Sequence, residues 1–271
     1  MEAPHASLDG KKIFAVGSQR RSELVRYDSR SGQFLPYLNG ISAACLSFSR
    51  DGKWIAYVSW PESELWRCRI DGSEKLQLTT APAVVASVDW SPDGSQIGYA
   101  ATLPGRHDGL FLVSASAGEA RQIAQSEEVG LRGIGWTPDG KSVVTALFSG
   151  SDKVSIRIID VKSANATEVS SFGTEVGAAL SPDGRYIAGT PVDGQKLMLY
   201  DMAAQKWFDL AKQSVNAIRW SADSQYVYFD TQSNADPAIY RVRISDRKLE
   251  TVASLKNLFA APFCRTHPGW A

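Results

Sequence analysis

The residue pair whose types are best suited to catalysis is His107 followed by Asp108. A histidine beside a carboxylate acts as a general base when a nucleophile or substrate lies within reach and its pKa is suitable. The other two histidines, His5 and His267, lie near the ends of the chain. A catalytic site of this kind needs several convergent His, Asp or Glu residues. We therefore interpret His107 as a surface residue and predict no catalytic residues and no enzyme activity.

A second group of residues that could do chemistry is a set of aspartates that recurs along the whole chain, since carboxylates can bind metal ions. One aspartate per repeat does not make a calcium loop, because such loops place several oxygen ligands within about a dozen residues. The three cysteines, Cys45, Cys68 and Cys264, follow no metal-binding spacing. We predict no metal and no cofactor. The recurring residues are Asp9, Asp51, Asp93, Asp139, Asp183 and Asp223.

Each of these aspartates belongs to a short turn phrase, Ser-Pro-Asp-Gly or a close variant. The phrase recurs every 40 to 46 residues. Proline presets φ for a type I turn, aspartate bonds back to the local backbone, and glycine accepts a positive φ. The last phrase, Ser221-Ala222-Asp223-Ser224, has neither proline nor glycine. We predict a turn in every repeat, and a looser one at this last position.

Apolar residues alternate with a period of two on both sides of each turn, which indicates a hairpin. Two further short strand patterns follow in every repeat. Four strands in a period of about 40 to 45 residues are typical of a β-propeller blade. We predict an all-β, six-bladed β-propeller with four antiparallel strands per blade over residues 1–253, and at most a turn or two of helix. The expected blades are 3–40, 41–82, 83–125, 129–171, 174–212 and 213–253.

The pattern also predicts which residues lie between blades and where the ring is weakest. The residue just before each turn is expected to be buried: Phe48, Trp90, Trp136, Leu180 and Trp220. The first repeat has little room for an innermost strand before its turn. We expect the tail 254–271 to supply a closing strand, with part of 254–263 packing near the first blade.

Composition excludes several classes of function. Lys plus Arg and Asp plus Glu both number 29, so the formal net charge is zero. This balance gives no general reason for binding nucleic acid or an anionic membrane. No apolar run is long enough for a membrane span, and the first residues do not resemble a signal peptide. We expect a cytoplasmic monomer as written, or a periplasmic protein if this sequence is a fragment that lacks an upstream segment.

Three stretches carry a family resemblance: "FSRDGKWIAYVSW", "WSPDGSQIGYA" and "LSPDGRYIAGT". They resemble the repeats of TolB-type, WD-like β-propellers, over residues 7–253. The segment 9–79 is similar to the propeller half of bacterial proteins that also carry a winged-helix or protein-kinase domain. The resemblance implies a sensory or scaffolding propeller attached to an effector. No kinase or winged-helix signature is present in this sequence.

Function is expected on the loops that follow the second and fourth strands of each blade, because rigid strands position them. We predict that this loop face binds a protein or peptide. The alternatives are a channel-mouth small-ligand receptor, a propeller hydrolase or lyase, and the gating propeller of a serine peptidase without its catalytic domain; a GxSxG motif is absent. The candidate residues are Arg20, Arg21, Trp60, Glu62, Arg106, His107, Asp108, Arg132, Lys153, Asp193 and Asp236.

Overall fold

The computed structural model describes residues 2–16, 22–126, 130–149, 153–172, 175–191, 193–231 and 236–259. Within these ranges almost every element is a strand. The helices of the described residues are the single 3-10 turn η1 (Leu38–Gly40) and the short α1 (Lys256–Phe259). The prediction of an all-β chain with at most a turn or two of helix is confirmed for this part of the chain.

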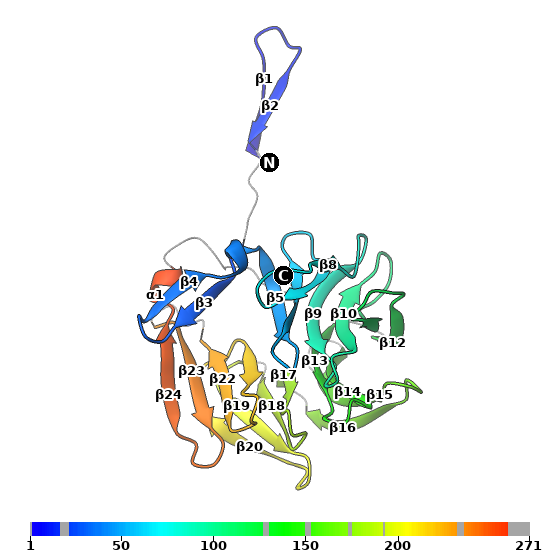
Figure 1. Ribbon diagram of the computed structural model, residues 1–271, viewed down its shortest axis with the longest axis vertical. Coiled ribbons are helices and arrows are strands. Elements are labelled where there is room, and N and C mark those ends of the chain that lie inside the picture. Colours follow the sequence, from blue (N-terminus) through cyan, green and yellow to red (C-terminus); the bar gives the residue numbers. More distant parts are fainter. Residues whose placement is uncertain are drawn as a thin grey trace.

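Five sheets of four antiparallel strands form the blades of a β-propeller (Figure 1). The first blade holds β5 (Ala43–Phe48), β6 (Trp54–Ser59), β7 (Leu65–Arg69) and β8 (Leu76–Gln77). The second holds β9 (Val84–Trp90), β10 (Gln96–Thr102), β11 (Gly109–Ser114) and β12 (Arg121–Gln125). The third holds β13 (Leu131–Trp136), β14 (Ser142–Ser149), β15 (Lys153–Asp160) and β16 (Ala166–Phe172).

The remaining two blades have the same strand order. The fourth holds β17 (Glu175–Leu180), β18 (Tyr186–Pro191), β19 (Leu197–Asp201) and β20 (Lys206–Ala211). The fifth holds β21 (Ile218–Trp220), β22 (Tyr226–Asp230), β23 (Ala238–Arg243) and β24 (Leu249–Ser254). The first strands of successive blades, β5, β9, β13, β17 and β21, lie side by side along the inside of the arrangement.

The repeated phrase forms the predicted turn in every blade. In the second blade, Ser91 Oγ donates to Asp93 Oδ1 at 2.6 Å, and the Gly94 N–H donates to the Ser91 carbonyl at 2.9 Å. The predicted looseness of the last turn is not seen. Ser224 takes the place of the glycine with φ 59°, and its N–H donates to the Ser221 carbonyl at 3.0 Å.

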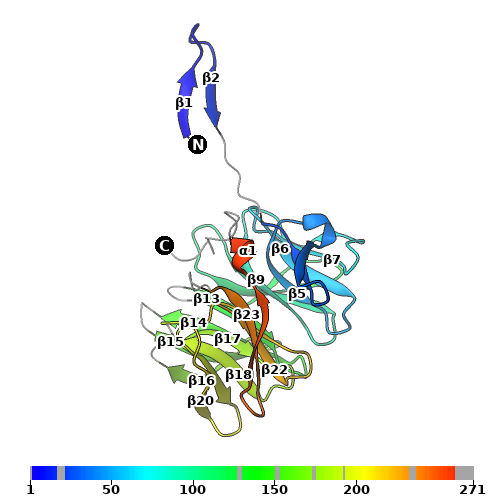
Figure 2. The same cartoon turned by 90° about the vertical axis from the view of Figure 1, so that its left-hand side faces the viewer.

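The prediction of six four-stranded blades is wrong. The residues expected to form the first blade split into two separate two-stranded sheets. β1 (Glu2–Ala6) pairs with β2 (Ile13–Val16), and β3 (Val25–Asp28) pairs with β4 (Gln33–Pro36). Figures 1 and 2 show the β1–β2 hairpin standing away from the blades.

The physical reason lies in how little of the hairpin's described surface is buried. The second strand of a complete blade buries consecutive residues, as β10 does with Ile97 and Tyr99 at 0% and 4% exposure. Side-chain burial in the hairpin is described for residues 6–13, where Ile13 is 77% exposed and Leu8 fully exposed, so these apolar side chains do not help to hold it against the blades. The sixth position therefore contains only β3 and β4.

The sixth position lacks inner strands, and this explains which of the residues before the turns are buried as predicted. Trp90 and Trp136 are buried at 5% and 7% exposure, as predicted. The indole Nε1 of Trp136 donates to the Asp89 carbonyl of the preceding blade at 3.3 Å, so this position points toward the preceding blade. Phe48 is 48% exposed, contrary to prediction, because none of the described strands forms an inner strand before its blade. Leu180 and Trp220 are half-buried.

The core is divided among the interfaces between blades. On β11, Phe111 and Val113 pack in one cluster with first-blade residues such as Val58. Leu110 and Leu112, which alternate with them, pack with third-blade residues such as Val143. Alternation with a period of two thus lets each blade bury both faces, and this packing holds the turns of neighbouring blades in a fixed arrangement.

The segment after the fifth blade begins a helix where a closing strand was expected. Leu255 is buried, and its N–H donates to the Pro237 carbonyl at 2.8 Å. Lys256, the first residue of α1, pairs with Asp236 at 3.0 Å. Part of the tail 254–271, which was expected to supply the closing strand, forms α1, and residues 260–271 lie outside the described ranges. Neither helix of the described chain is long or apolar enough to cross a membrane.

Candidate functional site

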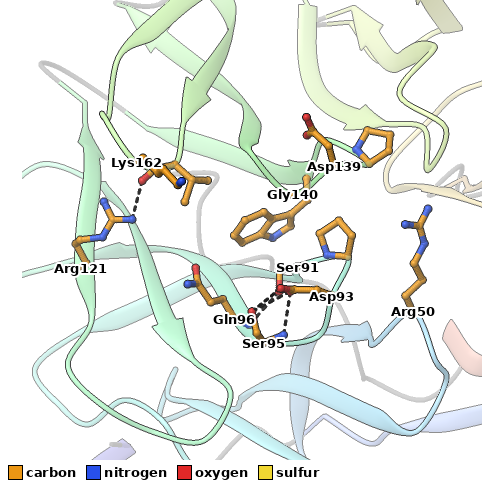
Figure 3. Close-up of a pocket in the computed structure, with 13 residues that line it drawn as sticks. Arg50, Ser91, Asp93, Ser95, Gln96, Arg121, Asp139, Gly140 and Lys162 are labelled. Carbon is orange, nitrogen blue, oxygen red and sulfur yellow. Dashed lines mark hydrogen bonds between the residues drawn. The ribbon is translucent and has the colours of Figure 1, made fainter.

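The turns between the first and second strands of the five complete blades lie together at one end of the blades, which we call the turn face. A cavity of about 520 Å³ opens there between the second and third blades, and we call it the turn-face pocket (Figure 3). It is lined by residues of the turns, by the end of β13 and by the connection between β15 and β16. The lining residues are Arg50, Ser91, Pro92, Asp93, Ser95, Gln96, Arg121, Trp136, Pro138, Asp139, Gly140, Val161 and Lys162.

Neighbouring turns pack proline against glycine around this face. A Cβ placed on Gly140 would lie 3.7 Å from Pro92 Cδ, and one placed on Gly184 would lie 2.9 Å from Pro138 Cδ. Both glycines have a positive φ, which side chains with a Cβ rarely adopt. The prolines of the second and third blades thus fill the space beside the glycines of the third and fourth blades.

Arg50 interrupts this packing in the first blade. It occupies the position of the proline, and no described atom lies within 4 Å of a Cβ built on Gly94, its counterpart in the second blade. Its exposed side chain instead extends over the turn face. There, Arg50 Nη2 donates to the Pro182 carbonyl of the fourth blade at 3.3 Å. Because Arg50 stands in place of a proline, the second-blade turn is left uncovered and a cation lies beside the opening of the turn-face pocket.

The floor of the pocket is apolar and rigid. Trp136 contributes its indole, with Nε1 bonded to the Asp89 carbonyl, and the rings of Pro92 and Pro138 lie in the two flanking turns. A Cβ on Gly98 would lie 3.3 Å from Trp136 Nε1, so the indole packs directly over that strand. Aromatic and proline rings offer a large contact area with little conformational entropy to lose on binding.

Three cations surround this floor. Figure 3 shows Arg121 and Lys162 on one side of the pocket and Arg50 on the other. Arg121 Nη2 donates to the Val161 carbonyl at 2.6 Å, which orients its guanidinium. Within the described ranges, no carboxylate forms an ion pair with any of the three. Hydrogen bonds from Ser163 and, to a smaller extent, the charge of Lys162 lower the pKa of Asp160, so Arg50 and Arg121 are the two cations most available to a bound anion.

The two carboxylates of the pocket are already engaged in their own turns. Hydrogen bonds from the Ser91 hydroxyl and from the backbone and hydroxyl of Ser95 hold the pKa of Asp93 below its usual value. A hydrogen bond from the Thr137 hydroxyl lowers the pKa of Asp139 in the same way, followed by one from the Lys141 backbone. Both are anions at neutral pH with oxygens committed to local donors. The arrangement suits binding of an acidic group that carries an apolar neighbour.

Nothing in the described pocket resembles a catalytic set. Its hydroxyls, those of Ser91 and Ser95, donate to Asp93 as part of the turn, and no histidine lines the cavity. No group of three or more His, Cys, Asp or Glu residues is placed to hold a metal ion in the ranges that the structure covers. The geometry supports recognition of a ligand through charge and shape.

The predicted loop-face residues are spread along the opposite end of the blades. Arg20 and Arg21 lie outside the described residues, and Arg132 and Lys153 lie in β13 and at the start of β15. Trp60 is half-buried and pairs through its backbone with Ser42. Arg106 and His107 are exposed. Whether this face binds a partner stays a prediction.

The acidic loop-face residues divide between local structure and a second pocket. Asp108 accepts hydrogen bonds from Thr102 Oγ1 and, at 3.2 Å, from the Leu131 N–H, so it joins its loop to the third blade. Asp193 accepts from the Gln195 N–H at 3.0 Å, and Asp236 pairs with Lys256. Glu62 lines a smaller pocket beside the first blade.

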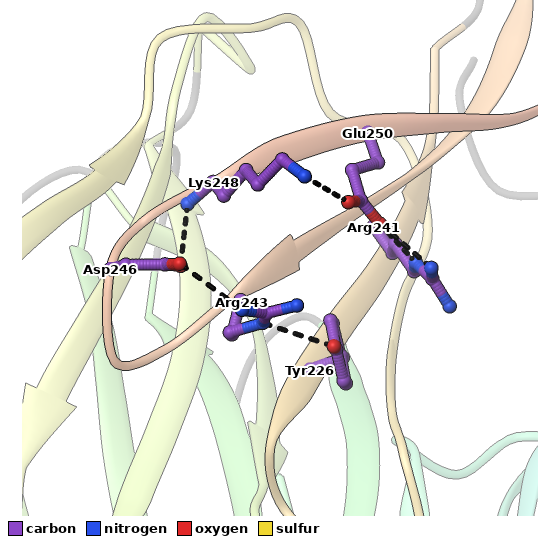
Figure 4. Close-up of polar contacts among 6 residues, drawn as sticks. All are labelled: Tyr226, Arg241, Arg243, Asp246, Lys248 and Glu250. Carbon is purple, nitrogen blue, oxygen red and sulfur yellow. Dashed lines mark hydrogen bonds and ion pairs between the residues drawn. The ribbon is translucent and has the colours of Figure 1, made fainter.

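A charged surface also covers one face of the fifth blade (Figure 4). Arg241 pairs with Glu250 at 2.7 Å, and Lys248 pairs with the same carboxylate at 2.9 Å. Arg243 pairs with Asp246 at 3.2 Å and donates Nε to the Tyr226 hydroxyl at 3.0 Å. Since each of the three cations is paired with one of the two carboxylates, we interpret the network as a solvated blade face rather than a ligand site.

A polar pair lies on the inner strands of the first two blades. Ser47 Oγ donates to Asp89 Oδ1 at 2.7 Å. Desolvation by burial raises the pKa of Asp89 to about 6, while the Ser47 hydrogen bond and the charge of Arg219 act in the opposite direction. The equivalent positions of the third and fourth blades are Gly135 and Ala179, so the pair has no counterpart there.

The turn-face pocket was missed at the level of the sequence, although a signal was present. The residues that the turns share have structural roles and carry no chemistry of their own. The informative residue is Arg50, which departs from the repeated phrase because it stands where the next three turns have proline. Arg121 and Lys162 could not be added in this way, since nothing in their spacing along the chain indicates that they flank one opening.

No family model matches the chain. A curated relative, the uncharacterized peptidase YuxL of Bacillus subtilis, is 26% identical in an alignment of 204 residues that covers 68% of this chain. The chain spans only 28% of the length of that protein. Among solved structures, a TolB structure from Agrobacterium tumefaciens has a TM-score of 0.72 at 19% identity, covering 88% of this chain and 90% of that one.

A chain of the nidogen–laminin complex has a TM-score of 0.70 at 12% identity, covering 87% of this chain and 91% of that one. At these identities the similarity establishes the fold. The resemblance inferred from the repeats is therefore confirmed at that level: the chain has a TolB-like β-propeller fold.

Proposed function

We propose that this chain is a non-catalytic binding module that takes an extended acidic segment of a partner protein into the turn-face pocket. The observation that carries this proposal is the combination of an apolar floor with three cations that no described carboxylate pairs. An aspartate, glutamate or terminal carboxylate would bind Arg50 and Arg121, while a neighbouring apolar side chain would lie on Trp136 and the proline rings.

The fold comparisons support a protein partner. A chain of similar fold is part of the nidogen–laminin complex, which is an assembly of two proteins. A propeller presents its turns on a rigid ring of blades, so a pocket between two turns is preorganised and loses little entropy on binding. Arg121 is already fixed by its bond to Val161, which adds to this preorganisation.

A second candidate function is favoured by the peptidase relative. The chain spans 28% of YuxL, so it would correspond to a part of such a protein. In that case the propeller would select or admit peptide substrates for a hydrolase domain. Both functions require the propeller to bind peptides, and they differ in whether a bound peptide is subsequently cleaved by another domain.

Selection from a displayed library of random peptides tests the proposal. Immobilised wild-type protein is expected to enrich peptides that combine an acidic residue with an apolar one. A selected peptide should bind Arg50→Gln about ten-fold more weakly than wild type, because a charge-assisted hydrogen bond contributes about 1.5–3 kcal/mol. Failure to enrich any peptide, or equal binding to both proteins, would contradict the proposal.

Lys53→Gln provides a matched control. Lys53 lies in the same turn as Arg50, carries the same charge and is exposed, but it pairs with Asp51 at 3.7 Å and does not line the pocket. Its replacement changes the net charge equally. We expect the selected peptide to bind Lys53→Gln with an affinity close to that of wild type, which separates a contact in the pocket from a general effect of charge.

A further inference from the structure

A second pocket lies on the face of the first blade that is turned toward β3 and β4. Its volume is about 370 Å³, and we call it the blade-wall pocket. It opens near the loop between β6 and β7, at the end of the blades opposite the turns. Aromatic rings, carboxylates and one ammonium group contribute most of its lining: Tyr57, Ser59, Glu62, Glu64, Trp66 and Lys75.

Two aromatic rings form the wall of this pocket. Tyr57 and Trp66 are register partners on β6 and β7, so their side chains stand next to each other on the same face of the sheet. Tyr57 is 6% exposed and Trp66 is half-buried. Burial raises the pKa of Tyr57 to about 12, so its phenol is neutral at physiological pH. Both rings present electron-rich π faces.

Two carboxylates stand beside these rings. Glu64 is fixed in place: Gln77 Nε2 donates to its Oε2 at 2.8 Å, and its N–H donates to Ser59 Oγ at 3.3 Å. Glu62 is exposed. In the part of the chain that the structure describes, neither glutamate forms an ion pair. Lys75 supplies the opposing charge, which leaves an excess of one negative charge in the lining.

The pocket exists because the sixth position holds only two strands. Elsewhere, the equivalent blade face is covered by the preceding blade, as Phe111 and Val113 are by the first blade. On the first blade, Tyr37, Leu38 and Ile41 pack against the cluster of Ile55, Tyr57 and Cys68 but leave the Trp66 ring half-buried. The Trp66 ring is thus kept accessible next to fixed negative charge.

We propose that the blade-wall pocket binds an alkylammonium group, such as a lysine side chain of a partner protein. The ammonium lies between Glu62 and Glu64, and the methylene stem and the positive charge pack against Trp66 and Tyr57. Cations are attracted to aromatic faces within about 6 Å of the ring centre. The chain already uses this pairing, since Arg67 lies 4.3 Å over the Trp54 ring in the same blade.

A titration of the full chain followed by NMR tests this site. The probe is Nα-acetyl-lysine N-methylamide, and its Nε-acetylated analogue is the neutral control. We expect the lysine probe to shift the Trp66 indole resonance and the neutral analogue to leave it unchanged. A parallel titration with n-butylammonium distinguishes the two possible sources of the alkylammonium group, a protein and a free amine. Tighter binding of the lysine probe indicates a protein ligand, and tighter binding of butylammonium indicates a free amine.

Three variants complete the test. Glu62→Gln is expected to weaken the lysine probe about five-fold, whereas Lys75→Met should strengthen its binding by removing the repelling charge. Glu119→Gln, at an exposed position outside the pocket, should bind like wild type. Equal binding of the neutral analogue, an unshifted Trp66 indole, or unchanged affinity in both pocket variants would overturn the proposal. Glu62 is exposed, so its replacement should leave folding intact.

Discussion

Arg50 Nη2 donates a hydrogen bond of 3.3 Å to the carbonyl oxygen of Pro182, and this contact joins the first and fourth blades over the turn face. The two residues occupy the same position in their respective turns. In the fourth blade the position holds proline, and in the first it holds a long cationic side chain. Arginine in place of proline at position 50 therefore removes a packing contact with the next turn. It also places a positive charge beside the turn-face pocket.

Arg50→Pro separates stability from binding. Proline is the residue found at this position in the next three turns, so it should fit the local backbone and reduce the entropy of the unfolded chain. We expect the free energy of unfolding to rise by about 0.5 kcal/mol, while binding of an acidic peptide is lost. Urea denaturation and a peptide titration on the same sample measure both. A variant that binds normally would show that the cation is dispensable.

Gly184→Ala should destabilise the ring of turns more than Gly94→Ala. Both glycines have a positive φ, at 75° and 71°, so both variants suffer the same backbone strain. A Cβ at Gly184 would also lie 2.9 Å from Pro138, whereas the described surroundings of Gly94 are open. We expect about 1 kcal/mol for the shared strain and a further 1–2 kcal/mol for the clash. Thermal unfolding of the two variants gives the difference, and equal losses would mean that the turns are not packed as described.

Trp136→Ala should cost roughly 3–5 kcal/mol of stability because it removes a large buried side chain between two blades. Phe48→Ala provides the contrast. Phe48 occupies the same repeat position but is 48% exposed, and we expect it to cost less than about 1.5 kcal/mol. Guanidinium titrations of both variants measure the two losses. Similar losses would mean that an inner strand does precede the first blade.

Asp89→Asn tests the half-buried carboxylate of the inner strands. The folded pKa of about 6 lies above the ordinary value of 3.8, so the folded state binds more protons than the unfolded state between these pH values. The free energy of unfolding should therefore fall as pH rises from about 4 to 6, and the penalty is complete above pH 6. An asparagine side chain cannot ionise, so the variant should lose this pH dependence.

At pH 7 we expect Asp89→Asn to be more stable than wild type by on the order of 2 kcal/mol, since one pKa unit corresponds to about 1.36 kcal/mol. Denaturant titrations of both proteins at several pH values provide the measurement. The difference between the two proteins cancels the contribution of the turn aspartates. A variant whose stability follows the same pH profile as wild type would show that Asp89 does not titrate in this range.

The repeat predicted most of the fold because its physics is local. Turn chemistry and alternation with a period of two placed the hairpins, and the buried Trp90 and Trp136 follow from their position before the turn. The number of blades depends on which strands pair with one another, and turn chemistry does not determine that pairing. The residues around Asp9 carry the same turn phrase as the others, but a turn does not specify which strands will lie beside its hairpin. In this hairpin the Ile13 side chain is left exposed.

The pocket was harder to predict than the fold. Lys162 follows β15 and Arg121 begins β12, and they come together only through the packing of the second blade on the third. Repeat analysis compares equivalent positions, and these two residues are not equivalent. Arg50 is the exception, since its departure from a repeated proline is visible in the printed sequence.

The most direct measurement is the ratio of dissociation constants for one selected acidic peptide with wild type and with Arg50→Gln, determined by isothermal titration at physiological salt. We expect the variant to bind about ten-fold more weakly, Lys53→Gln to match wild type, and the peptide with its carboxylates replaced by amides to bind both proteins equally weakly. Equal affinity of the acidic peptide for wild type and Arg50→Gln would contradict the assignment of the turn-face pocket as the binding site.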